Sequence, residues 1–358
     1  MIDLGDKNIS IRFIDWLVHC LSSKLIEAND IKFQKISSDA GFRRYFRLNT
    51  NPTLIAVYAP PKKEKNLSFV KIAAFLKSSG ILVPKILAVN FNEGFLIIQD
   101  FGDTTFQIAG TSSDYEALYR HADNLLLQFQ QLSIVDVQLP VFNKKMILDE
   151  VHLFEEWFLR KTLEVPYSAE AQELLNNTYK KLIDNFLEQP QVFVHKDYHS
   201  RNLMIVPNGQ IGVLDFQDAL VGPISYDLVS LYRDCYVSLD PQYVDKKILA
   251  HKKCLEINGV IVDVAPATFK RWFDLTGLQR HLKVLGIFSR LAIRDRKMKY
   301  LGDIPLVIRY VREVTSAYKE FERFDTWFAE TVESKLQTKK WFKGIQNNKA
   351  KGLSLIHI

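Results

Sequence analysis

Cysteine is scarce in this sequence, with only Cys20, Cys235 and Cys254 among 358 residues. Their odd number and wide spacing exclude a disulfide framework and favour a reducing compartment, the cytoplasm. Long apolar runs are also missing, since no segment approaches the roughly 18 apolar residues that a membrane span requires. Asp3 and Lys7 lie where a secretory signal would have an apolar stretch. We therefore expect a cytoplasmic protein without a membrane partner.

A strong charge of either sign is absent too. Lys and Arg number 47 against 41 Asp and Glu, which gives a net charge of +6. This excess is too small for a nucleic-acid-binding surface, so we expect no nucleic-acid partner. Hydrophobic residues at 47% and charged residues at 25% are ordinary for a globular enzyme. The length is sufficient for a full core divided between two lobes.

The most informative segment lies between residues 192 and 215. The apolar run 192–194 predicts a short buried strand, so Asp197 falls in the loop where that strand ends. Further on, the Asn-Gly pair within 207–210 separates two apolar runs and predicts a hairpin, because both turn positions tolerate a positive φ. The hairpin predicts that Asn202, at its start, and Asp215, at its end, lie at the same edge.

These side chains have the chemistry of phosphoryl transfer. An amide oxygen and a carboxylate suit Mg²⁺, which takes few protein ligands beside phosphate oxygens and water, and Asp197 can accept a proton. A zinc site at His195, Asp197 and His199 is an alternative, since alternate residues of an extended strand share a face. No nearby Cys or Glu completes such a site, and we favour hydrogen-bonding struts for both histidines.

The finer pattern is His-x-Asp-x-His-x-x-Asn, then Asp-Phe, Gly-Pro and Asp-Leu, over residues 195–228. It resembles the aminoglycoside phosphotransferase and choline kinase superfamily. The resemblance implies that Asp197 is the base or orienting group for the attacking hydroxyl, with Asn202 and Asp215 as magnesium ligands. It also implies that Asp227 braces the catalytic loop and that Asp218 is a further metal or substrate contact. From its position alone, Asp227 is equally an ordinary charge at a helix start.

The periodicity along the chain predicts an α+β, protein-kinase-like fold of two lobes. Residues 1–99 form a strand-rich, nucleotide-binding lobe with strands at 31–37, 43–48, 53–59, 84–89 and 94–99 and helices at 9–24 and 67–78. A hinge at 100–103 opens a mostly helical lobe, 100–335, that carries the catalytic, metal and substrate sites. Its helices are expected at 115–132, 146–161, 169–187, 226–239, 277–294 and 305–323. The basic tail, 336–358, is expected to be disordered or an artefact.

The small lobe departs from the usual kinase pattern. A kinase carries Lys in the third strand and Glu on the inner helix, and both are absent from 54–60 and 67–78. The loop 37–44 has one glycine, Gly41, so it is weak as a phosphate cradle. We expect Arg43 or Arg44 to supply the missing charge, though both also suit a solvated strand face. Adjacent strand residues point to opposite faces, so at most one of the two faces ATP. Gln99 lies at the hinge, where backbone groups usually contact adenine.

Several collinear segments narrow the resemblance. Arg-Arg-Tyr-Phe-Arg at 43–47, Ala-Pro-Pro at 59–61 and the segments 215–219, 222–236, 278–286 and 300–305 are similar to the anomeric amino-sugar kinases of cell-wall recycling. The similarity runs from about residue 8 to about residue 330. It implies an enzyme that uses ATP and Mg²⁺ to phosphorylate the C1 hydroxyl of N-acetylmuramate or N-acetylglucosamine. We also expect a monomer.

The substrate side is the least determined. N-acetylmuramate carries a carboxylate, for which an arginine is the natural partner. Arg280, Arg290 and Arg294 fall within an arc of about 80° opposite the leucines of their helix, which favours a solvated face. Arg233 and Asp234 follow the start of the helix at Asp227, so we expect these two to contact the substrate.

Two rivals remain open. The first is a kinase for another small alcohol, such as choline, homoserine or an aminoglycoside, whose cationic substrates call for an acidic or aromatic pocket. The second is an inactive kinase fold used as a binding module. The missing strand lysine supports this second rival, whereas the intact Asp197, Asn202 and Asp215 oppose it.

Overall fold

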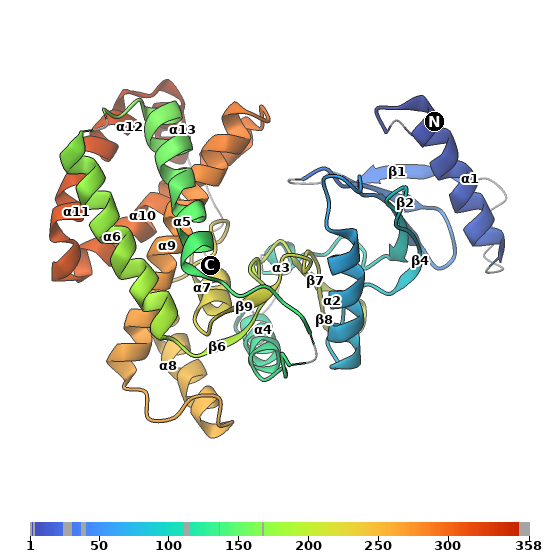
Figure 1. Ribbon diagram of the computed structural model, residues 1–358, viewed down its shortest axis with the longest axis horizontal. Helices are drawn as coiled ribbons and strands as arrows, with labels where there is room; N and C mark the ends of the chain where they lie inside the picture. Colours follow the sequence, from blue (N-terminus) through green and yellow to red (C-terminus); the bar gives the residue numbers. More distant parts are fainter. Residues whose placement is uncertain are drawn as a thin grey trace. The chain divides into compact units, whose positions relative to one another are not determined.

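The computed structural model describes residues 2, 4–23, 31–36, 41–110, 115–135, 137–166 and 168–350, with side chains up to residue 345. The chain forms two compact units, one made of Met1–Phe106 with Arg201–Asp218 and the other of Gln107–Ser200 with Ala219–Ile358. The α+β class is confirmed, with an antiparallel sheet in the first unit and mostly helices in the second (Figure 1). We expected the small lobe to be residues 1–99. The first unit instead extends to Phe106 and also contains Arg201–Asp218, which follows the catalytic loop.

The first unit is built on a five-stranded antiparallel sheet of order β1-β2-β3-β5-β4. Its strands are β1 (Phe33–Ile36), β2 (Arg44–Leu48), β3 (Leu54–Tyr58), β4 (Ile86–Asn90) and β5 (Phe95–Gln99). All five residues of the central strand β3 are buried, as its unbroken apolar run predicts. All five predicted strands are present, and the end of the first, Ser37, lies outside the described residues.

Two helices complete the small unit. Helix α1 (Lys7–Ser23) buries Phe13, Leu17 and Leu21, which recur every four residues, in the same hydrophobic core as β2, β3 and β5. Helix α2 (Asn66–Ser78) follows β3, and its Phe69 stacks on Phe216 with 4.9 Å between ring centroids. Helix α2 therefore packs against the segment that follows the predicted hairpin.

That hairpin consists of β7 (Leu203–Ile205) and β8 (Ile211–Val213). Its turn contains Gly209 at a φ of +79°, as the Asn-Gly signal predicts. The backbone N–H of Val213 donates to the carbonyl of Leu82 at 2.9 Å. A Cβ on Gly212 would lie 2.5 Å from the ring of Phe101, so only glycine allows this contact. These contacts fix the hairpin to the small unit.

The second unit is organised around one long helix. Its strands β6 (Gln191–Val194) and β9 (Leu220–Pro223) pair antiparallel. Its longer helices are α4 (Tyr115–Gln130), α5 (Lys144–Leu153), α6 (Ala169–Glu188), α7 (Tyr226–Tyr232), α8 (Pro241–Ile257), α9 (Pro266–Ile293) and α10 (Ile304–Ala317). Shorter elements are α3 (Phe106–Ala109), η1 (Phe154–Leu163), η2 (Met298–Asp303), η3 (Lys319–Phe321), α11 (Glu322–Trp327), η4 (Phe328–Glu333), α12 (Ser334–Thr338) and α13 (Lys340–Ala350).

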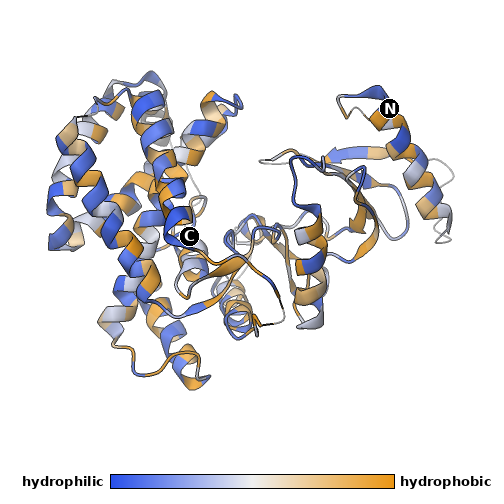
Figure 2. Cartoon of the chain, viewed as in Figure 1, coloured by the Kyte–Doolittle hydropathy of each residue, from blue (hydrophilic) through white to orange (hydrophobic). Residues whose placement is uncertain are grey.

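The middle of helix α9, residues 272–286, is buried on all sides, because α5, α6, α7, α8 and α10 all contact this helix. At Gly286 a Cβ would come within 2.3 Å of the backbone of Leu153. The absence of a side chain on this glycine therefore lets α5 approach closely. The peripheral helix α6 is amphipathic instead, with hydrophilic and hydrophobic residues on different faces (Figure 2). None of the described helices is long and apolar enough to cross a membrane.

Three helical predictions need correction. The helix from Tyr226 ends at Tyr232 instead of 239, and the helix expected from 277 begins at Pro266. The expectation of a disordered tail is wrong for residues 336–350, where α12 and α13 continue the helical unit. The cause is apolar burial, since Leu336 and Phe342 join the main hydrophobic core. Residues 351–358 lie outside the described part of the chain.

Candidate active site

The two predicted magnesium ligands lie side by side at the open end of the hairpin. Leu203 pairs with Val213, and the backbone N–H of Leu214 donates to the carbonyl of Asn202 at 2.9 Å. Asp215 follows directly, with a φ of +61° that is uncommon for a residue other than glycine. Such conformations are concentrated at functional sites. An amide oxygen and a nearly half-exposed carboxylate are a donor set that fits Mg²⁺.

Arg43 lies beside this carboxylate. Its Nη1 is 3.9 Å from Oδ1 of Asp215, and its Nε is 3.3 Å from Oε2 of Glu64. The guanidinium is buried over the ring of Phe69, 5.1 Å from the centroid. Arg44 is only half-buried, and an added Cβ on Gly5 would meet its guanidinium. The two arginines therefore face different surroundings, as strand alternation predicts.

Glu64 is a residue that the sequence analysis missed. It precedes α2 instead of lying on it, and it accepts a hydrogen bond from the backbone N–H of Phe42 at 2.9 Å. Gly41 has a φ of +92°, and an added Cβ would lie 3.4 Å from Oε1 of Glu64. An Arg43–Glu64 ion pair thus occurs in a unit that has no lysine in β3 and no glutamate on α2.

Two further candidates in the first unit have other partners. Asp218 forms an ion pair with Lys65, with Nζ 2.6 Å from Oδ1. The side chain of Gln99 accepts a hydrogen bond from the backbone N–H of Lys85 at 3.3 Å. The hinge aspartate Asp100 is bound to Arg47, 2.6 Å away. These contacts give Asp218 and Gln99 structural partners within their own unit.

The loop that carries Asp197 belongs to the second unit and is held by two buried carboxylates. Asp227 accepts hydrogen bonds from the backbone N–H groups of His195, at 2.6 Å, and Lys196, at 3.0 Å. Asp234 accepts one from Ser200 at 2.9 Å. Both carboxylates are 2% exposed, so each has a protein partner where water cannot reach. We expected Asp234 to contact the substrate; in the structure its carboxylate has the backbone contacts of a second brace.

The histidines have the packing of struts. His195 is fully buried, with its Nδ1 accepting from the backbone N–H of Asp197 at 3.3 Å. The ring of His199 lies edge-on to Tyr236, with centroids 5.4 Å apart. Within the described residues, no group of three or more His, Cys, Asp or Glu side chains is arranged to hold a metal ion, which leaves the zinc alternative without a site.

Positive charge surrounds Asp197. Nη2 of Arg280 lies 3.9 Å from its Oδ1. Burial raises the pKa of Asp197, but the charges of Lys283, His199, Arg280 and Lys196 outweigh this effect and lower the pKa to about 2. The carboxylate is 40% exposed, so an approaching hydroxyl can reach it. The group is therefore a permanently ionised acceptor at neutral pH.

Three of these cations come from an ion-pair network that the sequence analysis did not identify. Glu150, on α5, lies 2.8 Å from Nζ of Lys196 and 3.0 Å from Nζ of Lys283. Lys283 also donates to the hydroxyl of Tyr226 at 3.1 Å. Asp197 and Glu150 thus face Lys196, Lys283 and Arg280. The buried carboxylate of Asp234 also lies close enough to Arg280 to act on its charge.

The other predicted arginines are arranged differently. Arg233 forms an ion pair with Glu313 and lies over Tyr310, 5.1 Å from the ring centroid. Arg294 is exposed and paired with its neighbour Asp295. The solvated face expected for Arg280 is wrong, since this side chain is 4% exposed within the second unit. The two arginines therefore differ in burial, since Arg280 is buried and Arg294 is exposed.

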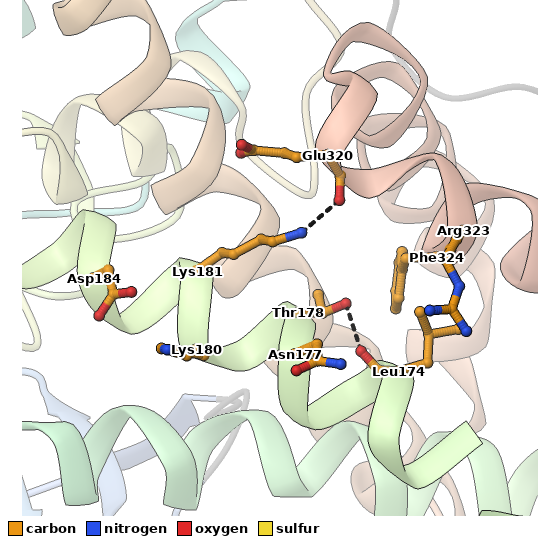
Figure 3. Close-up of a pocket in the computed structure, with 9 residues that line it drawn as sticks. All are labelled: Leu174, Asn177, Thr178, Lys180, Lys181, Asp184, Glu320, Arg323 and Phe324. Atoms are coloured by element: carbon orange, nitrogen blue, oxygen red, sulfur yellow. Dashed lines mark hydrogen bonds between the residues drawn. The ribbon is translucent and has the colours of Figure 1, made fainter. Parts of the chain in front are cut away.

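A groove of about 410 Å³ lies elsewhere in the second unit, between α6 and the segment η3–α11 (Figure 3). Lys181 crosses it and donates to the carbonyl of Glu320 at 2.6 Å. None of the predicted site residues lines this groove. It is therefore separate from the residues discussed above.

Comparison with known proteins gives a consistent family. Residues 32–252 match the phosphotransferase enzyme family. A Pseudomonas aeruginosa protein named N-acetylmuramate/N-acetylglucosamine kinase is 38% identical over 312 residues, which cover 85% of this chain and 91% of that protein. A Neisseria meningitidis protein of the same name is 38% identical over 290 residues, covering 79% and 86%.

Solved structures with low sequence identity share the fold. A choline/ethanolamine kinase family protein from Mesorhizobium loti gives a TM-score of 0.59 at 12% identity, covering 87% of this chain and 97% of that chain. An ADP-bound aminoglycoside phosphotransferase gives a TM-score of 0.52 at 16% identity, covering 86% and 99%. The strand-rich unit and the helical unit therefore form a protein-kinase-like fold.

Proposed function

This chain belongs to the phosphotransferase enzyme family, and we propose that it phosphorylates the anomeric C1 hydroxyl of N-acetylmuramate, N-acetylglucosamine or both. The phosphoryl donor is ATP, and the product is a sugar 1-phosphate that can be reused after peptidoglycan breakdown. We place the enzyme in the cytoplasm, because three widely spaced cysteines suit a reducing compartment, and we propose that it acts as a monomer.

In this proposal the catalytic-loop carboxylate orients the attacking hydroxyl. An anomeric hydroxyl is more acidic than an ordinary alcohol, so an ionised Asp197 has mainly to accept its hydrogen bond and then its proton. Asp227 and Asp234 hold the backbone on either side, which keeps this acceptor in place. Lys196, Lys283 and Arg280 keep the carboxylate ionised.

The nucleotide side uses residues of the first unit. Asn202 and Asp215 hold Mg²⁺, and Arg43 replaces the missing strand lysine as the cation that contacts phosphate. Bound Mg²⁺ neutralises phosphate charge during transfer. Glu64 fixes Arg43 through their ion pair, as the helix glutamate fixes the lysine of other kinases. That Asp197, Asn202 and Asp215 act on one magnesium nucleotide remains a prediction.

The single observation that carries the choice of substrate is that three cations, Lys196, Lys283 and Arg280, lie close enough to Asp197 to lower its pKa. A kinase for choline or an aminoglycoside binds a cation, which three neighbouring cations would repel. A neutral or acidic sugar has no such penalty. The two relatives are named for N-acetylmuramate, which is acidic, and N-acetylglucosamine, which is neutral. The cationic surroundings therefore favour an amino-sugar substrate over the amine rivals.

A substrate panel tests this proposal. ADP release is measured with ATP and Mg²⁺ after addition of N-acetylmuramate, N-acetylglucosamine, choline, homoserine, an aminoglycoside or no acceptor. We expect release with one or both sugars and a phosphorus NMR signal of an anomeric phosphate. Turnover of an amine in preference to either sugar refutes the substrate assignment. Nucleotide binding without turnover of any acceptor supports the inactive binding module instead.

A further inference from the structure

The guanidinium of Arg280 is buried without a strong hydrogen-bond acceptor. Its Nη1 lies 3.7 Å from the thiol sulfur of Cys235, which is a weak acceptor. Its Nη2 lies 3.9 Å from Asp197, beyond hydrogen-bond distance. Among the residues that the structure describes, its Nε has no hydrogen-bond partner. A buried charge with uncommitted donors is costly, and in a native site it calls for an explanation.

The neighbouring lysines do not share this situation. Lys196 and Lys283 both contact Glu150 at 3.0 Å or less, and Lys283 also reaches Tyr226. Their charges are therefore matched by an acceptor within the second unit. Arg280 combines full charge, near-complete burial and free N–H donors beside the half-exposed carboxylate of Asp197.

We propose that Arg280 binds the carboxylate of the acidic amino sugar and thereby sets the preference for N-acetylmuramate over N-acetylglucosamine. The planar fork of a guanidinium matches a carboxylate with two parallel hydrogen bonds, which a lysine cannot reproduce. Since Asp197 accepts the reacting hydroxyl, a donor 3.9 Å from it can reach another substituent of the same sugar. This inference rests on the proposed sugar kinase activity.

The test compares both sugars in one variant. Arg280→Met keeps most of the side-chain volume and removes the donors, so we expect kcat/KM for N-acetylmuramate to fall about 10- to 100-fold more than kcat/KM for N-acetylglucosamine. Taking the ratio cancels any effect through Asp197, because both sugars depend on that carboxylate. Arg294→Met, at the exposed end of the same helix, is the matched control and should leave both values unchanged.

An equal loss for the two sugars overturns the inference. That result would mean that Arg280 acts on Asp197 or on the transferring phosphoryl group, because a guanidinium binds phosphate oxygens as well as carboxylates. Arg280→Lys separates charge from shape, since it keeps the charge but loses the fork. We expect it to recover only part of the N-acetylmuramate preference.

A second measurement needs no variant and so does not depend on folding of Arg280→Met. Wild-type enzyme is given N-acetylmuramate or its uncharged carboxamide, which has nearly the same shape. We expect about a 10-fold or greater loss of kcat/KM with the amide, mainly through KM. Equal turnover of acid and amide overturns the assignment of Arg280. Failure to phosphorylate either sugar would overturn the proposed function together with it.

Discussion

The carboxylate of Asp234 accepts a hydrogen bond from the backbone N–H of Ser200 at 2.9 Å, at the far end of the loop whose near end is held by Asp227. Its other oxygen accepts from the backbone N–H of Tyr236 at 2.9 Å. The two buried carboxylates lie seven residues apart on α7 and the segment after it. Helix α7 and the residues directly after it thus hold both ends of the candidate catalytic loop.

We predict that Asp234→Asn lowers both stability and kcat. The asparagine keeps one acceptor oxygen but places its NH2 group against the other backbone donor, which costs about 1–3 kcal/mol at a buried site. The loop then loses its fixed end, so kcat should fall while KM for ATP changes little. Denaturant unfolding and steady-state kinetics measure the two effects. Asp240→Asn, at the exposed start of α8, is the control and should behave as wild type. A stable variant with unchanged kcat contradicts the brace.

The candidate base gives the most direct prediction. Asp197→Asn keeps the shape of the side chain and removes its charge, so kcat should fall about 10²–10⁴-fold. ATP affinity, measured by calorimetry with Mg²⁺, should be retained because Asp197 is not among the residues proposed to bind the nucleotide. A variant whose kcat stays within a few-fold of wild type would remove Asp197 from the mechanism.

The low pKa of Asp197 predicts a specific pH dependence. A folded-state pKa of about 2, below the ordinary value of 3.8, means that the unfolded chain binds more protons between these two values. The charge pairing of Asp197 therefore stabilises the fold fully above the ordinary value, and this contribution is lost as pH falls toward 2. Carboxyl-carbon NMR should show no titration of Asp197 from about pH 4 to pH 8. The signal is assigned by its absence from Asp197→Asn.

Removal of a neighbouring charge should move that titration in a known direction. In Arg280→Met the pKa of Asp197 should rise, because one of the cations that offset its burial is gone. A wild-type midpoint above about pH 4, or no upward movement in the variant, would show that the surrounding charges do not control Asp197.

Local patterns in the sequence were sufficient for part of this site. The Asn-Gly turn between apolar runs fixes the hairpin, so the proximity of Asn202 and Asp215 follows from residues within one short segment. The five-stranded sheet and the helix α1 follow from equally local periodicity. The brace role predicted for Asp227 came from resemblance and not from its own position, and in the structure Asp227 accepts hydrogen bonds from His195 and Lys196.

The remaining residues could not be found in this way because their contacts are distant in sequence. Helix α9 has leucines on one side and Arg280 on another. This pattern predicts that Arg280 is exposed, but only for a helix with one side in contact with water. Other helices cover the middle of α9 on all sides, so Arg280 and Lys283 are buried there and face Asp197 of the catalytic loop and Glu150 of α5. Glu64 was missed for a related reason, since its partner Arg43 lies 21 residues earlier, on the far side of β2 and β3.

The two adjacent arginines provide the last prediction. Arg43 is buried between Glu64 and Asp215, whereas Arg44 faces another side of its strand. Arg43→Ala should therefore raise KM for ATP about 10-fold or more, since a charged hydrogen bond to phosphate is lost. Arg44→Ala is the matched control, with the same change one residue away, and its KM should stay within about two-fold of wild type.

Glu64→Gln distinguishes a phosphate-binding arginine from one that only supports the fold. This substitution keeps the side-chain volume and weakens the hold on Arg43 without removing its charge. It should raise KM for ATP less than Arg43→Ala does, with little change in KM for the sugar. Unchanged ATP kinetics in both Arg43→Ala and Arg44→Ala would mean that neither arginine replaces the strand lysine. The phosphate charge would then have to be met by Mg²⁺ and backbone N–H groups alone.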